Sequence, residues 1–274
     1  MKYKLVAIDM DGTLLNSHDN ISERIRYAIN KAIDKGIKIV LSTGRIYLSA
    51  LYYRSLIDLN SPIIACNGAI VSNHKGDEIL YKSHINKDIL RKIIKLAEDN
   101  NVYYHFYDLS TFYCKKGNNN FAKYYEYYEE NFKKQGINII GFDNPSEIIN
   151  VNSTYYKFVI IEDDIDKLQY LRGKMEQIKG ISVSKSWHNN MEIMNEGVSK
   201  GKALKFLAHM LKIDNGEIIA IGDNENDVSM FKIAGLAVAM KNGDKIAKEN
   251  AHIITDTNDD DGVAKVIEKY ILKY

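Results

Sequence analysis

Apolar residues in the first quarter of the chain alternate between short continuous runs and helically spaced sets. Residues 4–9 form an apolar run that ends in an acid, and Ser22 then opens a segment with helical spacing that stops at Gly36. Further apolar runs cover 37–41 and 63–65, with a second helical pattern between them that extends to Ile57. This order of strand, helix, strand, helix and strand predicts a parallel sheet covered by helices on both faces.

The same pattern returns near the end of the sequence. Ser199 is placed to cap a helix whose apolar residues, from Leu204 to Leu211, share one face. Buried strands are predicted over 218–221, 236–240 and 253–254.

Between these two blocks, from about residue 84 to 194, the pattern changes. Helices are predicted over 86–98, 121–134 and 165–178, and strands over 102–107, around 112–113, and over 155–161, 181–184 and 192–194. We therefore predict an α/β fold with a Rossmann-like, doubly wound parallel-sheet core made of 1–83 and 195–274. An α+β domain, 84–194, is inserted into it.

A pair of acids follows the first predicted strand, in Asp9-Met10-Asp11-Gly12-Thr13. Ligands of open α/β sheets bind beyond the carboxyl ends of the strands, and strand alternation starts Asp9 and Asp11 on the same side before the turn at Gly12. Two close carboxylates repel unless a cation or a shared proton intervenes, and one can then act as nucleophile while the other transfers protons. The alternative is a turn rich in turn-forming residues, but the full string has a chance expectation of only about 0.002.

A second acidic group, Gly222-Asp223-Asn224-Glu225-Asn226-Asp227, follows another buried strand. Acids at a strand end and four residues later suit an inner and an outer contact to Mg²⁺, which prefers oxygen ligands and commonly pairs with phosphate. The alternative is that Asp223 merely caps the next helix.

Two weaker features could bind an anion. Thr43, Gly44 and Arg45 follow a strand and open a helix, where backbone N–H groups attract phosphate, although capping by Ser42 or Thr43 explains them equally well. Lys200 or Lys202 could supply a positive charge, although a single lysine is usually solvated surface.

Composition and missing motifs exclude several classes. The 274 residues carry 37 basic and 36 acidic side chains, a net charge of +1, which disfavours nucleic-acid binding driven by global charge. Cys66 and Cys114 are too few for a disulfide framework or a zinc cluster, and the seven histidines lack metal-ligand spacing. Neither a Gly-x-Ser-x-Gly elbow nor a P-loop is present.

The hydrophobic segments are short. The N-terminal apolar stretch is shorter than a signal peptide requires, and no segment approaches the 18 or so apolar residues of a membrane span. We expect a cytoplasmic protein without membrane contact, as a monomer or a dimer.

The order of these motifs resembles the haloacid dehalogenase superfamily of phosphohydrolases, and the late insertion resembles its Cof-type branch, subclass IIB. The resemblance covers nearly the whole chain. Its four motifs correspond to Asp9–Thr13, Thr43 in Ser42-Thr43-Gly44-Arg45, Lys200 in Val198-Ser199-Lys200-Gly201, and Gly222–Asp227; Asn67-Gly68-Ala69 and Met240-Lys241-Asn242-Gly243 also fit the branch.

The resemblance implies a role for each matched residue. Asp9 attacks phosphorus to form an aspartyl-phosphate, and Asp11 protonates the leaving alcohol and then activates water. Mg²⁺ is held by the Asp9 carboxylate, the Asp11 backbone carbonyl and Asp223, with support from Asp227. The phosphoryl group is bound by residues that include Gly12, Thr43, Gly44, Lys200 and Asn226. Residues 84–194 form a cap of the C2B type, with hinges near Ser83-His84 and at 195–198.

The resulting hypothesis is a Mg²⁺-dependent phosphatase for a small phosphorylated metabolite, with sugar phosphates as candidates. Two alternatives stay open: a sugar phosphomutase of a related branch, and a catalytically silent sugar-phosphate sensor. The presence of both Asp9 and Asp11 argues against the sensor, which needs neither a nucleophile nor an acid. Trp187, His188 and Asn189, on a predicted cap turn, are candidate specificity residues.

Overall fold

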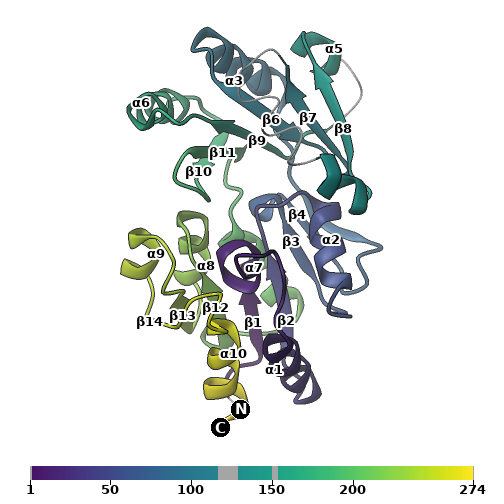
Figure 1. Cartoon of the computed structure of the whole chain (residues 1–274), viewed down its shortest axis with the longest axis vertical. Coiled ribbons are helices and arrows are strands. Elements are labelled where there is room, and N and C mark those ends of the chain that lie inside the picture. The colour runs from purple at the N-terminus through teal and green to yellow at the C-terminus, as the bar shows by residue number, and fades with distance from the viewer. Residues whose placement is uncertain (1, 117–128, 150–153, 274) are drawn as a thin grey trace.

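The computed structural model describes residues 2–116, 129–149 and 154–273, which form two β-sheets with helices around them (Figure 1). The larger sheet has eight strands. Their order is β14 (Ile253–Ile254), β13 (Leu236–Ala239), β12 (Ile218–Gly222), β1 (Leu5–Ile8), β2 (Lys38–Ser42), β3 (Ile63–Ala65), β4 (Ile70–Ser72) and β5 (Ile79–Lys82).

Strand β1 lies in the middle of this sheet and is fully buried. It pairs in parallel with β12 on one side and with β2 on the other, with Leu5 opposite Ile218 and Lys38. After β1 the chain first builds the side of the sheet that begins with β2 and later builds the other side, which begins with β12. The strand order therefore reverses at β1. The carboxyl ends of β1, β2 and β12 therefore meet at one edge, where α/β enzymes bind ligands.

The two faces of the core sheet are covered by different helices. Val6 and Ile8 pack with α1 (Glu23–Asp34), α2 (Tyr47–Ser55) and α10 (Gly262–Ile267), whereas Leu5 and Ala7 pack with α7 (Lys200–Met210), α8 (Val228–Phe231) and α9 (Lys245–Glu249). The predicted doubly wound core is thus confirmed. The predicted caps are also present, since the side chains of Ser22 and Ser199 accept hydrogen bonds from the backbone N–H of Ile25 and Lys202.

The far edge of the core sheet departs from the expected parallel arrangement. Strands β4 and β5 run antiparallel to their neighbours. The chain reverses after β3 in the short turn Cys66–Gly68, whose three residues all have positive φ values, of 49°, 56° and 98°. So short a connection can only join antiparallel strands, because a parallel pair needs a long crossover.

The second sheet has six strands, in the order β10 (Ile181–Ser184), β11 (Asn190–Asn195), β9 (Lys157–Ile161), β6 (Tyr103–Tyr107), β7 (Thr111–Lys115) and β8 (Asn138–Phe142). One face packs against α3 (Lys87–Asp99), α5 (Pro145–Ile149) and α6 (Ile165–Met175). On the other face, Ile46 of the core joins a cluster with Tyr103 and Val159. Figure 1 shows this unit stacked on one end of the core, beyond α2 and α7.

The predicted helix 121–134 falls partly outside the described residues, which resume at 129 with a helical stretch to 134. All described strands of the second sheet, and α3, α5 and α6, lie between Lys87 and Asn195. This supports our proposal that 84–194 are the inserted cap and that 1–83 and 195–274 are the core. Within the ranges that the structure describes, no helix combines the length and apolar character that a membrane crossing needs.

Candidate active site

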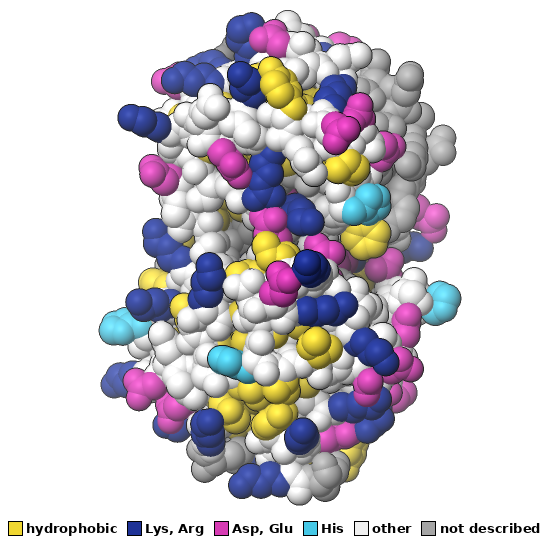
Figure 2. Space-filling model, turned by 90° about the vertical axis from the view of Figure 1, so that its left-hand side faces the viewer, with side chains coloured by type: hydrophobic (Ala, Val, Ile, Leu, Met, Phe, Trp, Pro, Cys, Tyr) yellow, Lys and Arg dark blue, Asp and Glu magenta, His cyan; other side chains and the backbone are white. Residues whose placement is uncertain are grey.

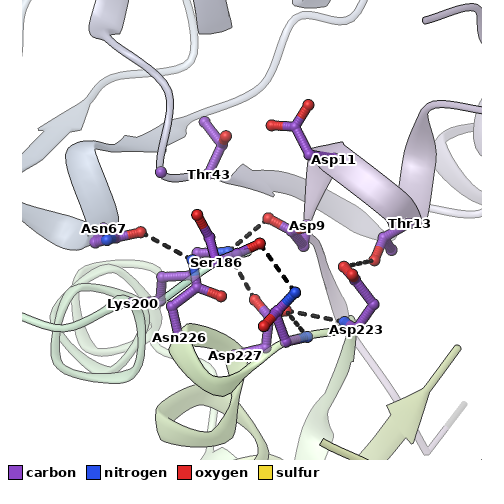
Figure 3. A network of polar contacts seen from close by, with 12 residues as sticks. Asp9, Asp11, Thr13, Thr43, Asn67, Ser186, Lys200, Asp223, Asn226 and Asp227 are labelled. Atoms are coloured by element: carbon purple, nitrogen blue, oxygen red, sulfur yellow. Dashed lines mark hydrogen bonds and ion pairs between the residues drawn. The ribbon is translucent and has the colours of Figure 1, made fainter. Parts of the chain in front are cut away.

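Four segments that are distant in the sequence meet at the carboxyl edge of the core sheet (Figure 3). Asp9 follows β1, Thr43 follows β2, Asp223 follows β12, and Lys200 is the first residue of α7. The parallel register of the three strands places their ends side by side. The four motifs therefore form one site.

The centre of the site is a buried lysine between two carboxylates. The Nζ atom of Lys200 lies 2.5 Å from Oδ1 of Asp9 and 2.6 Å from Oδ1 of Asp227. All three side chains are almost fully buried. Burial alone lowers the pKa of a lysine, but Asp227 and Asp9 outweigh it and raise the pKa of Lys200, which therefore stays charged.

Asp223 is fixed by the turn that follows β1. Its Oδ1 accepts a hydrogen bond of 2.8 Å from the Thr13 hydroxyl. Gly12 has a φ of +73°, and a Cβ atom there would lie 2.6 Å from Oδ2 of Asp223. Only glycine suits this position, because any side chain would strain the backbone and collide with the carboxylate. The Asn242 amide donates to the Gly12 carbonyl at 2.8 Å and anchors the turn.

Asp227 holds the loop after β12 in place. Its Oδ2 accepts hydrogen bonds from the backbone N–H groups of Asp223, at 2.9 Å, and Asn224, at 3.0 Å, while its Oδ1 contacts Lys200. Both carboxylate oxygens are thus engaged within the protein. This geometry suits a residue that supports a metal ligand such as Asp223.

Three buried carboxylates could hold a cation here. Ligand atoms of Asp9, Asp223 and Asp227 all lie within 4.8 Å of one another. Burial and the neighbouring acids raise the pKa of Asp9 well above its ordinary value, and burial and Asp227 raise the pKa of Asp223 to about 7. Lys200 balances only part of this negative charge, so the site fits a hard cation with oxygen ligands.

The Asp11 carboxylate does not join this cluster. It points away from Asp9 and Asp223 (Figure 3), and its side chain is 54% exposed. The sequence leads one to expect the two acids on one side, but the one-turn segment Met10–Leu14 begins at once after Asp9 and rotates Asp11 outward. There Arg45 binds it, from Nε to Oδ2 at 2.9 Å and from Nη2 to Oδ1 at 2.5 Å.

The environment of Asp11 sets its protonation. Enclosure in the cleft works to raise the pKa of Asp11, but the charge and hydrogen bonds of Arg45 outweigh it, and the pKa is lowered. Asp11 is therefore ionised in this arrangement. The catalytic role predicted for it stays a prediction.

Further polar residues of the site follow β2, β3 and β12 (Figure 3). The Thr43 hydroxyl is buried and accepts a hydrogen bond of 3.1 Å from the backbone N–H of Arg45. The Asn226 amide donates to Oδ1 of Asn67 at 3.2 Å. With Gly44, these residues, which we call the phosphate corner, come from the ends of β2, β3 and β12.

Sequence reasoning missed two charged residues of the second sheet, Lys157 and Glu192. Lys157 Nζ lies 2.7 Å from the Gly44 carbonyl oxygen, and the Asn67 amide donates to Oε2 of Glu192 at 2.6 Å. Lys157 begins the otherwise apolar strand β9, and Glu192 lies between the apolar residues Met191 and Ile193 of β11. A charge inside an apolar run is rarely buried without a purpose, and this signal could have identified both residues.

A cleft of about 1030 Å³ extends from Asp9 toward the second sheet. Its lining includes Trp187, His188 and Asn189, the residues expected to contribute to specificity. Cys66 and Cys114 are buried free thiols, and burial raises the pKa of each to about 12.

The fold and the site together define an α/β protein with a carboxylate centre at the switch point of its sheet. Residues 6–267 match the model of a family described as haloacid dehalogenase-like hydrolase. The chain is 32% identical to the putative phosphatase YxeH of Bacillus subtilis, over 98% of this chain and 99% of that protein.

Solved structures of known proteins have the same fold as this chain. A haloacid dehalogenase-like hydrolase from B. subtilis superimposes with a TM-score of 0.88 at 28% identity, covering 98% of this chain and 99% of that one. The subclass IIB sugar phosphatase BT4131 has the same fold, with a TM-score of 0.80 at 23% identity and coverage of 97% and 98%. The chain belongs to the haloacid dehalogenase-like hydrolases, in the Cof-type branch, and is a phosphatase of that family.

Proposed function

We propose that this protein is a Mg²⁺-dependent phosphatase that hydrolyses small phosphorylated metabolites, sugar phosphates among them, through an aspartyl-phosphate on Asp9. The observation that carries the proposal is the position of Asp9. Its carboxylate lies at the end of β1, 2.5 Å from the Lys200 ammonium and in one cluster with Asp223 and Asp227. The description of BT4131 as a sugar phosphatase supports the substrate class.

In the first step, an Asp9 carboxylate oxygen attacks phosphorus and the bond from phosphorus to the substrate's alcohol oxygen breaks. Asp11 donates the proton that the leaving alkoxide requires. Because Asp11 is ionised and bound to Arg45 here, this step requires that Asp11 take up a proton and turn toward the leaving oxygen. In the second step, Asp11 accepts a proton from water, which attacks phosphorus and frees Asp9.

The remaining residues bind charge. Lys200, Thr43, Asn226 and the backbone at Gly12 and Gly44 are assigned to the phosphoryl oxygens. We assign Mg²⁺ to the carboxylates of Asp9 and Asp223 and the backbone carbonyl of Asp11, with Asp227 in support. When bound, Mg²⁺ offsets the repulsion between the nucleophile and the anionic substrate.

The test is hydrolysis of p-nitrophenyl phosphate by the purified protein with and without Mg²⁺. We expect release of inorganic phosphate that requires the metal and is lost in Asp9→Asn. Product analysis with a sugar phosphate separates the alternatives, because a mutase yields an isomerised ester and a silent sensor yields no product. Absence of any metal-dependent turnover across a panel of phosphate esters rejects the proposal. A cytoplasmic location belongs to the same proposal and follows from a metabolite substrate.

A further inference from the structure

The cap carries a buried ion pair at its boundary with the core. Lys157 of β9 and Glu192 of β11 lie 2.5 Å apart, from Nζ to Oε1, with side-chain exposures of 4% and 3%. Both strands belong to the second sheet, where β9 and β11 are neighbours. The pair therefore moves with the cap as one unit.

Each partner of this pair also contacts the core. Lys157 donates to the Gly44 carbonyl at 2.7 Å, and Glu192 accepts from the Asn67 amide at 2.6 Å. Asn67 in turn accepts from the Asn226 amide at 3.2 Å. The cap is thus hydrogen-bonded to two residues of the phosphate corner, Gly44 and Asn67.

The space at Gly44 supports the same connection. A Cβ atom on Gly44 would lie 3.0 Å from Nζ of Lys157 and 2.9 Å from Oδ1 of Asn67. Unlike Gly12, Gly44 has no positive φ that would require glycine. Its lack of a side chain is therefore needed for the close approach of the cap lysine.

Energetics argue against a purely structural pair. Removing two charges from water is costly, and apolar residues of similar volume often stabilise a fold equally well or better. The Glu192 carboxylate also accepts from the Ser186 hydroxyl at 2.7 Å, so its oxygens are held by three neighbours. Such a network orients the groups that it contacts.

We propose that Lys157 and Glu192 are positioning residues that couple the seating of the cap to the geometry of the phosphate corner, through its residues Gly44, Asn67 and Asn226. The proposal rests on the phosphatase function proposed above. When the cap is seated, the pair fixes the Gly44 carbonyl and the Asn67 amide and so holds Asn226 in place. Because coupling is reciprocal, a phosphate bound in the corner favours the seated cap by the same factor.

The main test uses the double variant K157M/E192L. Replacing both charges avoids an unpaired buried ion, so its midpoint of thermal unfolding should stay near that of the wild type. We expect its dissociation constant for inorganic phosphate, measured by calorimetry with Mg²⁺ present, to rise about tenfold, as for the loss of one charged hydrogen bond. For a sugar phosphate, kcat/KM should fall by about 10².

The matched control is K185M. Lys185 of the cap also pairs with the core, at 3.2 Å from Asp244, but its side chain is 32% exposed and contacts none of the corner residues by a described hydrogen bond. Figure 2 shows charged side chains of both signs gathered along the boundary between the two lobes. If any charged contact across this boundary served equally, K185M would weaken phosphate binding as much as K157M/E192L does; we expect a change below twofold.

E192Q is a second variant that keeps the shape of the side chain but removes its charge and replaces one of its two acceptor oxygens by a donor. If K157M/E192L does not fold, phosphate affinity and turnover are measured on E192Q instead. Wild-type phosphate affinity and turnover in whichever of these two variants is folded overturn the inference. Calorimetry with phosphate needs no turnover, so a wild type that binds phosphate but hydrolyses no ester rejects the phosphatase function separately.

Discussion

Arg45 donates hydrogen bonds to the Asp11 carboxylate from two nitrogen atoms, from Nε to Oδ2 at 2.9 Å and from Nη2 to Oδ1 at 2.5 Å. This contact lowers the pKa of Asp11 and keeps the proposed proton donor ionised. Arg45 lies two residues after Thr43, so the loop that borders the phosphate corner also controls the protonation of Asp11.

Arg45→Met should shift the pH dependence of turnover. Without the guanidinium, the pKa of Asp11 rises, and the limb of the kcat/KM profile that reports Asp11 moves to higher pH. The measurement is kcat/KM for p-nitrophenyl phosphate against pH at saturating Mg²⁺. An unchanged profile in a folded, active variant contradicts the link between Arg45 and Asp11.

Lys200→Met should abolish turnover and destabilise the metal-free protein. The substitution leaves Asp9 and Asp227 buried without their cation, which costs about 3–5 kcal/mol of unfolding free energy. Chemical denaturation with and without Mg²⁺ measures this loss. We expect the metal to restore part of the stability and none of the activity. Wild-type stability without metal would show that Lys200 does not compensate these carboxylates.

The stabilising effect of Mg²⁺ should increase with pH. The pKa of Asp223 is raised to about 7 in the folded protein, far above the value of about 3.9 for an unfolded aspartate. Between these values the metal-free folded state binds a proton that the unfolded state has lost, and this contribution to stability disappears as the pH rises through about 7.

Protons therefore compete with the metal at low pH. At high pH the carboxylates are ionised, and the metal offsets the repulsion between them. The shift in unfolding midpoint caused by Mg²⁺ should be larger near pH 8 than near pH 5.5. Asp223→Asn should remove most of this trend. An equal shift at both pH values in the wild type speaks against Asp223 as a ligand.

Gly12→Ala should disable the site, because the added methyl group lies 2.6 Å from Oδ2 of Asp223. Gly36→Ala is its control, since Gly36 also has a positive φ, +83°, but no atom lies within 4 Å of an added Cβ. Both variants should lose about 1–3 kcal/mol to backbone strain. Only Gly12→Ala should lose catalysis, by about 10² or more in kcat. Equal kcat values in the two folded variants would show that the close approach of Gly12 to Asp223 is not needed for catalysis.

Elements that are defined by local apolar periodicity and by capping residues could be predicted from the sequence. The helix after Ser22 and the buried strand β12 follow directly from apolar spacing, and the acids appear at strand ends where parallel topology gathers them. The antiparallel pair β4 and β5 was not predicted, although Asn67-Gly68 is a strong turn signal. The positive φ of Cys66, which is unusual for that residue type, has no local sequence signal.

The contacts of the site depend on long-range geometry that no local pattern contains. Lys157 and Glu192 are 35 residues apart, and they reach Gly44 and Asn67 only because the second sheet stands over the carboxyl edge of the core. The ion pair of Asp11 likewise depends on Arg45, 34 residues later in the chain. Spacing alone could place the acids near the site but could not orient them.

Trp187 lies on the turn between β10 and β11, in the lining of the cleft, with 59% of its surface exposed. It is the single tryptophan among the 274 residues. The intrinsic fluorescence of the protein, excited at the indole band, therefore arises at the mouth of the cleft alone. The molecule contains its own optical probe of occupancy, and rapid-mixing experiments can follow ligand arrival and departure without an attached dye.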